Sequence, residues 1–380
     1  MKRRTAQIFL TITSTMLIIM LLGTALIYRR GAAPTSVYNL SADACYAQIN
    51  LNWDKKDGAS GYYIYMSEDG EHYNQFGESD STTCSYVIDD YDHNKAYYFQ
   101  VSAYKENILT RRKSEGEPSE PVNAKYDPSQ YAQKIPIITY HQVSPDGIDI
   151  DESLEVYESV FDEQMKFLNE NGYKTLTPDE FYLWHAGMKE FPVKSVMITF
   201  DDGFRGVYDI AYPILKKYDQ AATLFCIGKN TYNDTGNDKY YVNQDIIKKV
   251  REEYPKFSFE SHTYDMHSRV DGKVPARSFS LDQIKADCEK NAALDFSYLA
   301  YPWGNYSDTM QKALKECNYK MAFTYRPFYY ALRSDDTYAI NRIKIKGNYS
   351  MDTFITIVEG RSTSRDNPDA TENKEQNESI

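Results

Sequence analysis

Two adjacent carboxylates mark the part of this sequence best suited to chemistry. Asp201 and Asp202 follow the apolar run 196–200 and precede Gly203. Neighbouring ionised carboxylates repel each other, so a metal ion or an arginine is usually needed to hold them. The run is typical of a buried strand of a parallel sheet, and ligands bind at the carboxyl ends of such strands. Asp201 and Asp202 therefore predict a cation site at one strand end.

Two histidines supply matching ligands. His262 and His267 follow a second short apolar run, 257–260. On a helix their spacing of five would set the side chains about 140° apart, so we expect them to converge from a loop. One carboxylate and two imidazoles suit Zn²⁺, with another divalent transition metal as the alternative, and leave a position open for water. An Fe(II) site for oxygen chemistry is a further alternative.

A third motif, Leu-Ala-Tyr-Pro-Trp-Gly at 299–304, is typical of a strand that runs into a turn. Such a turn can present backbone N–H groups to a developing oxyanion. Proline has no N–H, so Trp303 or Gly304 is the expected donor. We assign Tyr301, Trp303 and Gly304 to the substrate and oxyanion part of the site.

Short apolar segments alternate with helical ones from about 135 to 357, which predicts an α/β fold with a mainly parallel sheet. Capping boxes at Thr177 and Ser280 mark two helix starts. We assign 130–358 to one catalytic domain. The strands expected in it are 135–140, 195–200, 222–227, 257–260 and 296–300.

The three motifs, Thr-Phe-Asp-Asp-Gly at 199–203, His262-Thr263 with His267, and Tyr-Pro-Trp-Gly at 301–304, resemble in this order the polysaccharide deacetylases of carbohydrate esterase family 4, which have the NodB-type fold. The resemblance covers residues 135 to about 345. It implies a distorted (β/α) barrel and a zinc-dependent hydrolase that removes N-acetyl groups from a glycan. It further implies that Asp201 is the general base and that Asp202, His262 and His267 bind the metal.

The sequence departs from most of that family at the histidine spacing, which is four there, and at Ala300, where the family has an arginine that steadies the base. Both departures resemble the branch that deacetylates poly-β-1,6-N-acetylglucosamine. There we expect another arginine to steady the base. Arg342 is the candidate, and an ordinary surface arginine is the alternative.

The Leu-x-His motif that supplies the family's general acid is absent. His141 directly follows the expected strand 135–140, at the end where the other catalytic groups gather. We therefore expect His141 to be the general acid. His185, within an amphipathic helical stretch, is the alternative.

Residues 37–125 consist of short alternating segments separated by turn residues, which predicts a β-sandwich. Trp53 in an early strand and the Tyr-x-Phe-x-Val-x-Ala strand at 97–103 resemble a fibronectin type III domain. We interpret this unit as a spacer, with carbohydrate or wall binding as the alternative. Cys45 and Cys84 could form a disulfide in an oxidising compartment.

An uncharged run from Thr5 to Tyr28 lies between two groups of cations. About 24 helical residues span roughly 36 Å, enough to cross a membrane. The run is long for a signal peptide and lacks a good cleavage site, so 1–30 is predicted to be an uncleaved anchor with a short cytoplasmic tip; a cleaved signal is the alternative. The catalytic domain is then expected outside the cell.

The net charge of -12 disfavours nucleic acid as a partner, and the polar segment 361–380 is predicted to be a disordered tail. The sequence thus predicts a membrane-anchored, extracellular deacetylase of a polysaccharide, with poly-β-1,6-N-acetylglucosamine favoured and peptidoglycan N-acetylglucosamine the alternative. A non-catalytic wall-binding protein with a decayed deacetylase domain is the alternative of another class.

Overall fold

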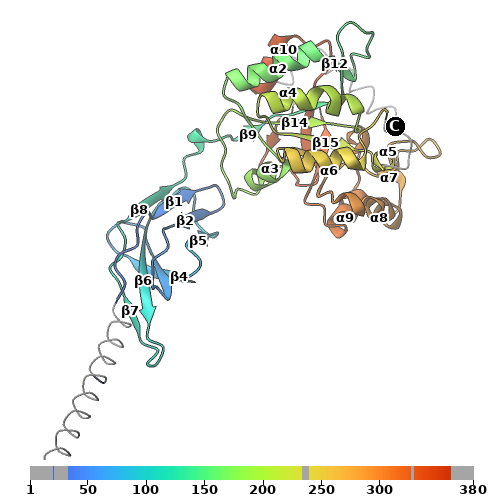
Figure 1. Ribbon diagram of the computed structural model, residues 1–380. Helices are drawn as coiled ribbons and strands as arrows, with labels where there is room; N and C mark the ends of the chain where they lie inside the picture. The colour runs from blue at the N-terminus through green and yellow to red at the C-terminus, as the bar shows by residue number, and fades with distance from the viewer. Residues whose placement is uncertain (1–19, 21–32, 233–238, 327–328, 361–380) are drawn as a thin grey trace, which may run out of the picture. The chain divides into compact units, whose positions relative to one another are not determined.

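The chain divides into two compact units, residues 1–127 and 128–380, in the computed structural model (Figure 1). The structure describes residue 20 and residues 33–232, 239–326 and 329–360. The predicted anchor, apart from Met20, and the predicted tail lie outside the described residues. Within those residues, no helix has both the length and the apolar character needed to cross a bilayer.

The first unit is built from two antiparallel sheets. One has the order β1 (Ser41–Ala44), β2 (Ile49–Asn52), β5 (Ser85–Ile88). The other has the order β4 (Asn74–Asp80), β3 (Gly61–Ser67), β6 (Ala96–Glu106), β7 (Lys113–Glu115), and β8 (Val122–Lys125) also pairs with β6.

Alternating side chains build the core of this unit, as predicted. Tyr97, Phe99, Val101 and Ala103 of β6 are all buried, because every second residue of a strand faces the same side. The predicted β-rich unit is confirmed, and its assignment as fibronectin type III stays a prediction.

Cys45 and Cys84 are not joined by a disulfide, so the suggested pairing is not formed. The Cys45 sulfur accepts a hydrogen bond from the Asn50 amide, and the Cys84 sulfur lies 4.0 Å from the Tyr62 hydroxyl.

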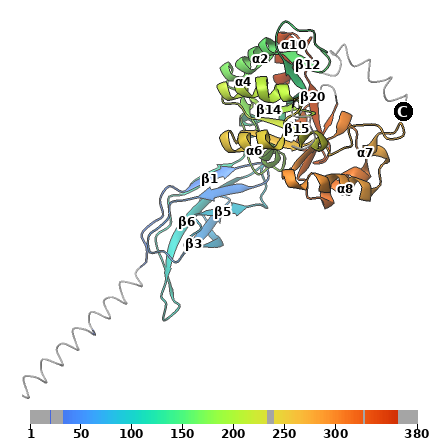
Figure 2. The ribbon, with the colours of Figure 1, turned by 45° about the vertical axis from the view of Figure 1, so that its right-hand side comes forward.

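The second unit contains a closed ring of seven parallel strands (Figures 1 and 2). Pairing of β10 with both β20 and β14 closes the ring. The expected (β/α) barrel is confirmed. Its strands, in order around the ring, are β10 (Ile137–Tyr140), β20 (Ile340–Lys344), β18 (Met321–Tyr325), β17 (Tyr298–Ala300), β16 (Phe257–Ser261), β15 (Ala222–Cys226) and β14 (Ser195–Phe200).

Short elements complete the barrel unit. β13 (Lys174–Thr175) extends the sheet beyond β14, β9 (Lys134–Ile135) pairs with β19 (Ala331–Leu332), and β11 (Gln142–Ser144) pairs with β12 (Glu155–Tyr157). The α-helices are α2 (Glu158–Glu170), α3 (Pro178–His185), α4 (Tyr212–Lys217), α5 (Gly228–Thr231), α6 (Gln244–Glu253), α7 (Pro275–Ser278), α8 (Leu281–Lys290), α9 (Asp308–Glu316) and α10 (Met351–Val358). The other helical segments are the 3₁₀ turns η1 (Pro128–Gln130), η3 (Ala292–Leu294) and η4 (Pro302–Gly304) and the π-helical turn η2 (Val207–Ala211). Both predicted capping boxes are present, at the starts of α3 and α8.

Alternation along the barrel strands decides which side chains reach the interior. In β14, Val196, Ile198 and Phe200 pack outward among helix residues, whereas Met197 packs in an interior cluster. Ile137 of β10 and Ile340 of β20 belong to the same interior cluster. Stepping by two towards the carboxyl end of each strand leads from these apolar residues to Asp201, His141 and Arg342. The carboxyl ends of the strands therefore bring polar side chains together at one end of the barrel interior.

Candidate catalytic site

A bidentate ion pair lies at the centre of this end of the barrel. Arg342 Nη1 donates to Asp201 Oδ1 at 2.7 Å, and Nη2 donates to Oδ2 at 2.8 Å. Both residues are buried, and the guanidinium also lies 5.2 Å from the centre of the Phe225 ring. Because β10 lies between β14 and β20 in the ring, the two side chains meet across the barrel interior. Arg342 is thus a buried partner of Asp201 and not a surface residue.

The ion pair fixes the charge of Asp201. Burial on its own would raise the pKa of this carboxyl, but the positive charge and hydrogen bonds of Arg342 outweigh burial and hold the pKa well below its usual range. Asp201 is therefore ionised at neutral pH, which is the state that a proton acceptor requires.

A left-handed turn directs the second carboxylate to the same opening. Asp202 has φ 73° and Gly203 has φ 82°, so the extended strand ends at Asp201. Aspartate is one of the few non-glycine residues that adopt this conformation readily. Asp202 Oδ1 consequently lies 3.4 Å from His262 Nε2 and 3.3 Å from His267 Nε2.

These three side chains fit a metal ion. One ligand atom from each of Asp202, His262 and His267 lies within 4.8 Å of the others. Asp202 Oδ1 is buried and has no hydrogen-bond donor among the described residues. A buried carboxylate oxygen without a donor is costly, and a cation between it and the two imidazole nitrogens would satisfy it. The predicted ligands are therefore brought together in an arrangement suited to Zn²⁺ or a similar ion.

The backbone of β17 orients the first histidine. His262 Nδ1 lies 2.8 Å from the carbonyl oxygen of Ala300, so that nitrogen carries the proton and donates it. The lone pair of Nε2 is then directed towards Asp202. Metal-binding histidines commonly use their second nitrogen in this way, to fix tautomer and ring orientation. Ala300, which replaces the family's arginine in sequence, contributes through its carbonyl group.

Asp287 of α8 holds the loop that carries the second histidine. Its Oδ1 accepts a hydrogen bond from Tyr264 N at 2.8 Å, and its Oδ2 accepts one from Asp265 N at 2.9 Å. Residues 262–269 contain no helix, as the histidine spacing predicted. A buried carboxylate on a helix therefore fixes the backbone between the two histidines, and the sequence analysis did not find this residue.

Replacing Asp287 by Asn should weaken zinc binding about tenfold, in the range seen when residues supporting metal ligands are changed. An amide offers one oxygen to two N–H groups and turns its own NH₂ group towards the other, so part of the loop loses its anchor. Zinc dissociation constants measured by competition with a chromophoric chelator check this. Glu289→Gln, an exposed change on the same helix, is the matched control. An unchanged zinc affinity with a lower unfolding free energy would reduce Asp287 to a purely structural role.

The structure separates the two candidate general acids. His141 interacts electrostatically with Asp201, Asp202 and His262, and its Nδ1 is buried without a hydrogen-bond partner among the described residues. His185 instead lies at the end of α3, where Nε2 is 3.1 Å from the carbonyl oxygen of Asp335. His141 is thus the histidine placed beside the carboxylates.

Lys344 is a site residue that the sequence analysis missed. It lies two residues after Arg342 in β20, so both side chains face the barrel interior, and strand alternation could have identified it. Burial lowers the pKa of this half-buried lysine, while the nearby charges of Asp201 and Asp202 oppose that shift. Its ammonium group has no ion-pair partner among the described residues, which leaves it available to a ligand.

The third motif divides between the core and the site. Tyr301 was assigned to the substrate part of the site, but its side chain is fully buried and its hydroxyl donates to the carbonyl oxygen of Tyr338. The Tyr301 side chain is therefore part of the core. Gly304 N–H donates to the carbonyl oxygen of Tyr301, which leaves Trp303 N–H as the donor available to an oxyanion. The Trp303 ring is 47 % exposed and lies 4.6 Å from the His267 ring. Trp303 is therefore the member of the motif that both borders the metal ligands and faces solvent.

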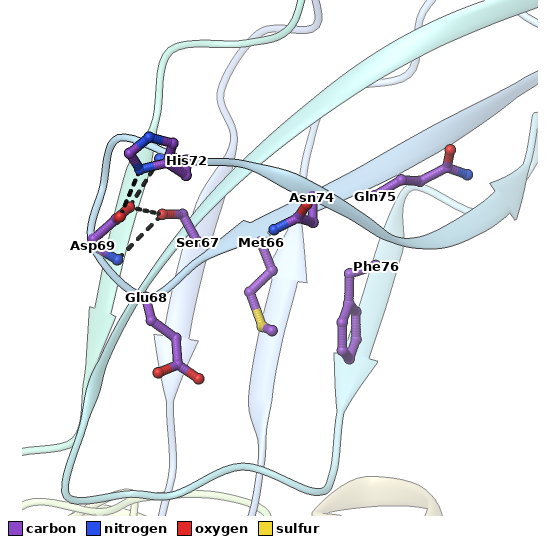
Figure 3. A pocket seen from close by; sticks show the side chains of 8 residues that line it. All are labelled: Met66, Ser67, Glu68, Asp69, His72, Asn74, Gln75 and Phe76. Carbon is purple, nitrogen blue, oxygen red and sulfur yellow. Dashed lines mark hydrogen bonds and ion pairs between the residues drawn. The ribbon is translucent and has the colours of Figure 1, made fainter.

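The sandwich has a hollow of its own beside the turn between β3 and β4 (Figure 3). Met66, Glu68 and Phe76 contribute to its lining. Asp69 accepts a hydrogen bond from the Ser67 hydroxyl, and its Oδ2 lies 2.8 Å from His72 Nδ1. Figure 3 marks both interactions. These polar groups hold the turn and satisfy one another. The spacer interpretation of this unit stays a prediction.

Comparisons with known proteins agree on one kind of relative. The family model described as polysaccharide deacetylase matches residues 188–322. YxkH of Bacillus subtilis, which carries a provisional name as a polysaccharide deacetylase, is 34% identical over 227 residues, covering 60% of this chain and 76% of that protein. The poly-beta-1,6-N-acetyl-D-glucosamine N-deacetylase of Staphylococcus epidermidis is 33% identical over 215 residues, covering 53% and 71%. The Streptococcus pyogenes deacetylase PplD in complex with acetate superposes with a TM-score of 0.52 at 28% identity, covering 59% and 98%.

Proposed function

Since this chain belongs to the polysaccharide deacetylase family, and is thus a hydrolase of amide C–N bonds, we propose that it removes N-acetyl groups from poly-β-1,6-N-acetylglucosamine in a metal-dependent reaction outside the cell. The substrate proposal is supported by the named activity of the staphylococcal relative and by the sequence features shared with that branch. We also propose that the run from Thr5 to Tyr28 anchors the enzyme in the membrane. Peptidoglycan N-acetylglucosamine is the competing substrate.

One observation carries the proposed chemistry. A buried, ionised carboxylate, Asp201, adjoins a second carboxylate that faces two imidazoles. The first carboxylate is saturated by Arg342, whereas Asp202 has an oxygen without a donor. The two neighbours are thus held in different states, one as a base and one as a ligand.

Asp202, His262 and His267 would hold the metal. A bound divalent ion of this kind lowers the pKa of water and polarises a carbonyl oxygen. Asp201 accepts a proton from the attacking water, since it is ionised and fixed in orientation by Arg342. Trp303 N–H donates to the oxygen that becomes negative, because neither neighbouring residue has an N–H free for this.

His141 delivers a proton to the leaving nitrogen. Burial lowers the pKa of His141 to about 4, so the ring is neutral in the free enzyme at neutral pH. The imidazolium must therefore form during the reaction and is not present at its start. The pKa of Asp201 lies lower still, so a proton taken from water by Asp201 passes favourably to His141 and then to the amine. Acetate and a free glucosamine amine are the products.

Acetate release by the purified full chain tests the proposal. We expect release from poly-β-1,6-N-acetylglucosamine oligomers to exceed that from matched peptidoglycan fragments, to stop on chelation and to return with zinc. Preference for peptidoglycan would refute the substrate but keep the chemistry. Absence of acetate from both, with zinc bound, would favour the decayed, wall-binding alternative.

A further inference from the structure

A hairpin of the sandwich presents an apolar tip surrounded by cations. Ile108 and Leu109, in the turn between β6 and β7, are 82% and 79% exposed. Adjacent large aliphatic residues with this exposure are costly in water unless something covers them. Four cations flank the tip, namely Lys105, Arg111, Arg112 and Lys113.

The tip has a defined conformation. The Asn107 side chain accepts hydrogen bonds from Leu109 N and Thr110 N, each at 3.0 Å. The Asn107 carbonyl oxygen accepts a further bond from Arg111 N at 2.8 Å, and Arg111 has φ 56°. This turn closes the hairpin beneath the two aliphatic side chains and holds them outward.

The charge of the hairpin opposes the charge of the chain. Arg111 pairs with Glu106 and Lys113 pairs with Glu78, whereas Lys105 and Arg112 have no carboxylate partner within the described part of the chain. An excess of cations at one apolar tip, on a chain of net charge -12, suits a surface that is apolar beneath and anionic at its edge. A bilayer with anionic headgroups is such a surface.

The β6–β7 hairpin projects from the end of the sandwich unit at which Pro34 lies. A Cβ atom built on Gly116 would clash with the Pro34 carbonyl oxygen, so these two residues are in contact. Further along both segments, β1 packs beside β8. Residues 34–44 therefore run in the same direction as 116–125, and Pro34 lies at the end of the unit towards which the hairpin projects. Figure 2 shows the hairpin extending beyond the rest of the unit.

The segment between the predicted anchor and Pro34 is similar in length to the part of the hairpin that lies beyond Gly116. The predicted membrane-spanning run ends at Tyr28, six residues before Pro34, which is about 20 Å of extended chain. Arg112, at the base of the turn, precedes Gly116 by four residues, which is about 13 Å of extended chain, and the turn that carries Leu109 lies beyond it. The tip can therefore reach the plane from which the predicted anchor emerges.

We propose that the β6–β7 tip is a second membrane contact, in which Ile108 and Leu109 enter the interface of a bilayer and the flanking cations meet anionic headgroups. Interfacial segments of proteins combine these two contributions. Together with the anchor, the tip gives the sandwich two points of attachment and so limits its tilt. The proposal rests on the predicted anchor and not on the deacetylase activity.

Photocrosslinking of the full chain in vesicles tests this contact. p-Benzoylphenylalanine replaces Leu109 in one preparation and Val87, a half-exposed valine of β5, in the control. Vesicles are of phosphatidylcholine alone or mixed with phosphatidylglycerol. We expect lipid adducts mainly from position 109 and mainly with phosphatidylglycerol present. Each of Lys105→Gln and Arg112→Gln should lower the equilibrium for contact about fivefold.

Resistance of the chain to carbonate extraction reports on the anchor separately. Equal adduct yields from positions 109 and 87 in a carbonate-resistant chain would overturn the tip contact. A yield from position 109 that does not depend on phosphatidylglycerol would overturn the role of the cations. Release of the chain by carbonate would refute the anchor and, because the proposal rests on the anchor, would also overturn the tip as a second contact.

Discussion

Asp201→Asn is expected to lower kcat/KM for deacetylation by about 10²–10⁴, the range for loss of a general base. The amide cannot accept a proton, but it keeps the size of the carboxylate and one of the two bonds to Arg342. Zinc binding should remain, because Asp202, His262 and His267 supply the predicted ligands. Acetate release, together with zinc content, measures both parts.

His262→Ala is the matched variant for the ligand set, and it should lose zinc as well as activity. The pair of variants separates the base from the metal site. Near-normal turnover by Asp201→Asn would show that another group takes the proton. Loss of zinc from Asp201→Asn would instead show that the two neighbouring carboxylates do not have separate roles.

Arg342→Met is expected to lower the unfolding free energy of the metal-free protein at pH 7 by about 3–5 kcal/mol, the usual cost of removing one partner of a buried pair. In the parent protein the pKa of Asp201 is depressed, so its stabilising contribution is present above the ordinary carboxyl pKa and is lost as pH falls through the depressed value. In the variant, burial without Arg342 raises the pKa of Asp201. The deficit should therefore shrink as pH falls through this raised pKa, which lies above the ordinary carboxyl value of about 4, because the buried carboxyl is then protonated and uncharged. Urea unfolding at several pH values measures it.

The double variant Asp201→Asn, Arg342→Met is the control that separates the loss of charge pairing from the loss of arginine packing. Removing the carboxylate charge along with its partner leaves no unpaired buried ion, so the double variant should be more stable at pH 7 than Arg342→Met alone. If the double variant were less stable, the loss would come from the volume and packing of the arginine and not from its charge.

Most of the site could be predicted from motifs that follow strands. The run before Asp201 identified β14 with its observed bounds, and the spacing of His262 and His267 identified a loop. Prediction was weaker for the last two strands of the ring along the chain, although they are no shorter than strands that were predicted. β18 and β20 were not among the expected strands, so Arg342 was selected only through the family resemblance.

Two further residues show what the sequence alone does and does not contain. Because Ala300 faces the barrel interior, alternation along the strand places Tyr301 outward, in the hydrophobic cluster where it is found. We assigned Tyr301 to the site only because it belongs to the third motif. Asp287 could not be found in this way, because its role depends on hydrogen bonds to a loop more than twenty residues earlier in the chain. Only tertiary structure brings those groups together.

The order of strands around the ring has a consequence for synthesis of the protein. Residues 188–322, which match the family model, include all three predicted metal ligands but neither His141 nor Arg342. Arg342 lies on the last strand of the ring, which is translated after every other strand of the barrel. A nascent chain that stops before Ile340 therefore contains the predicted ligands without the arginine that pairs with Asp201, so we expect hydrolytic activity only once translation of the barrel is complete.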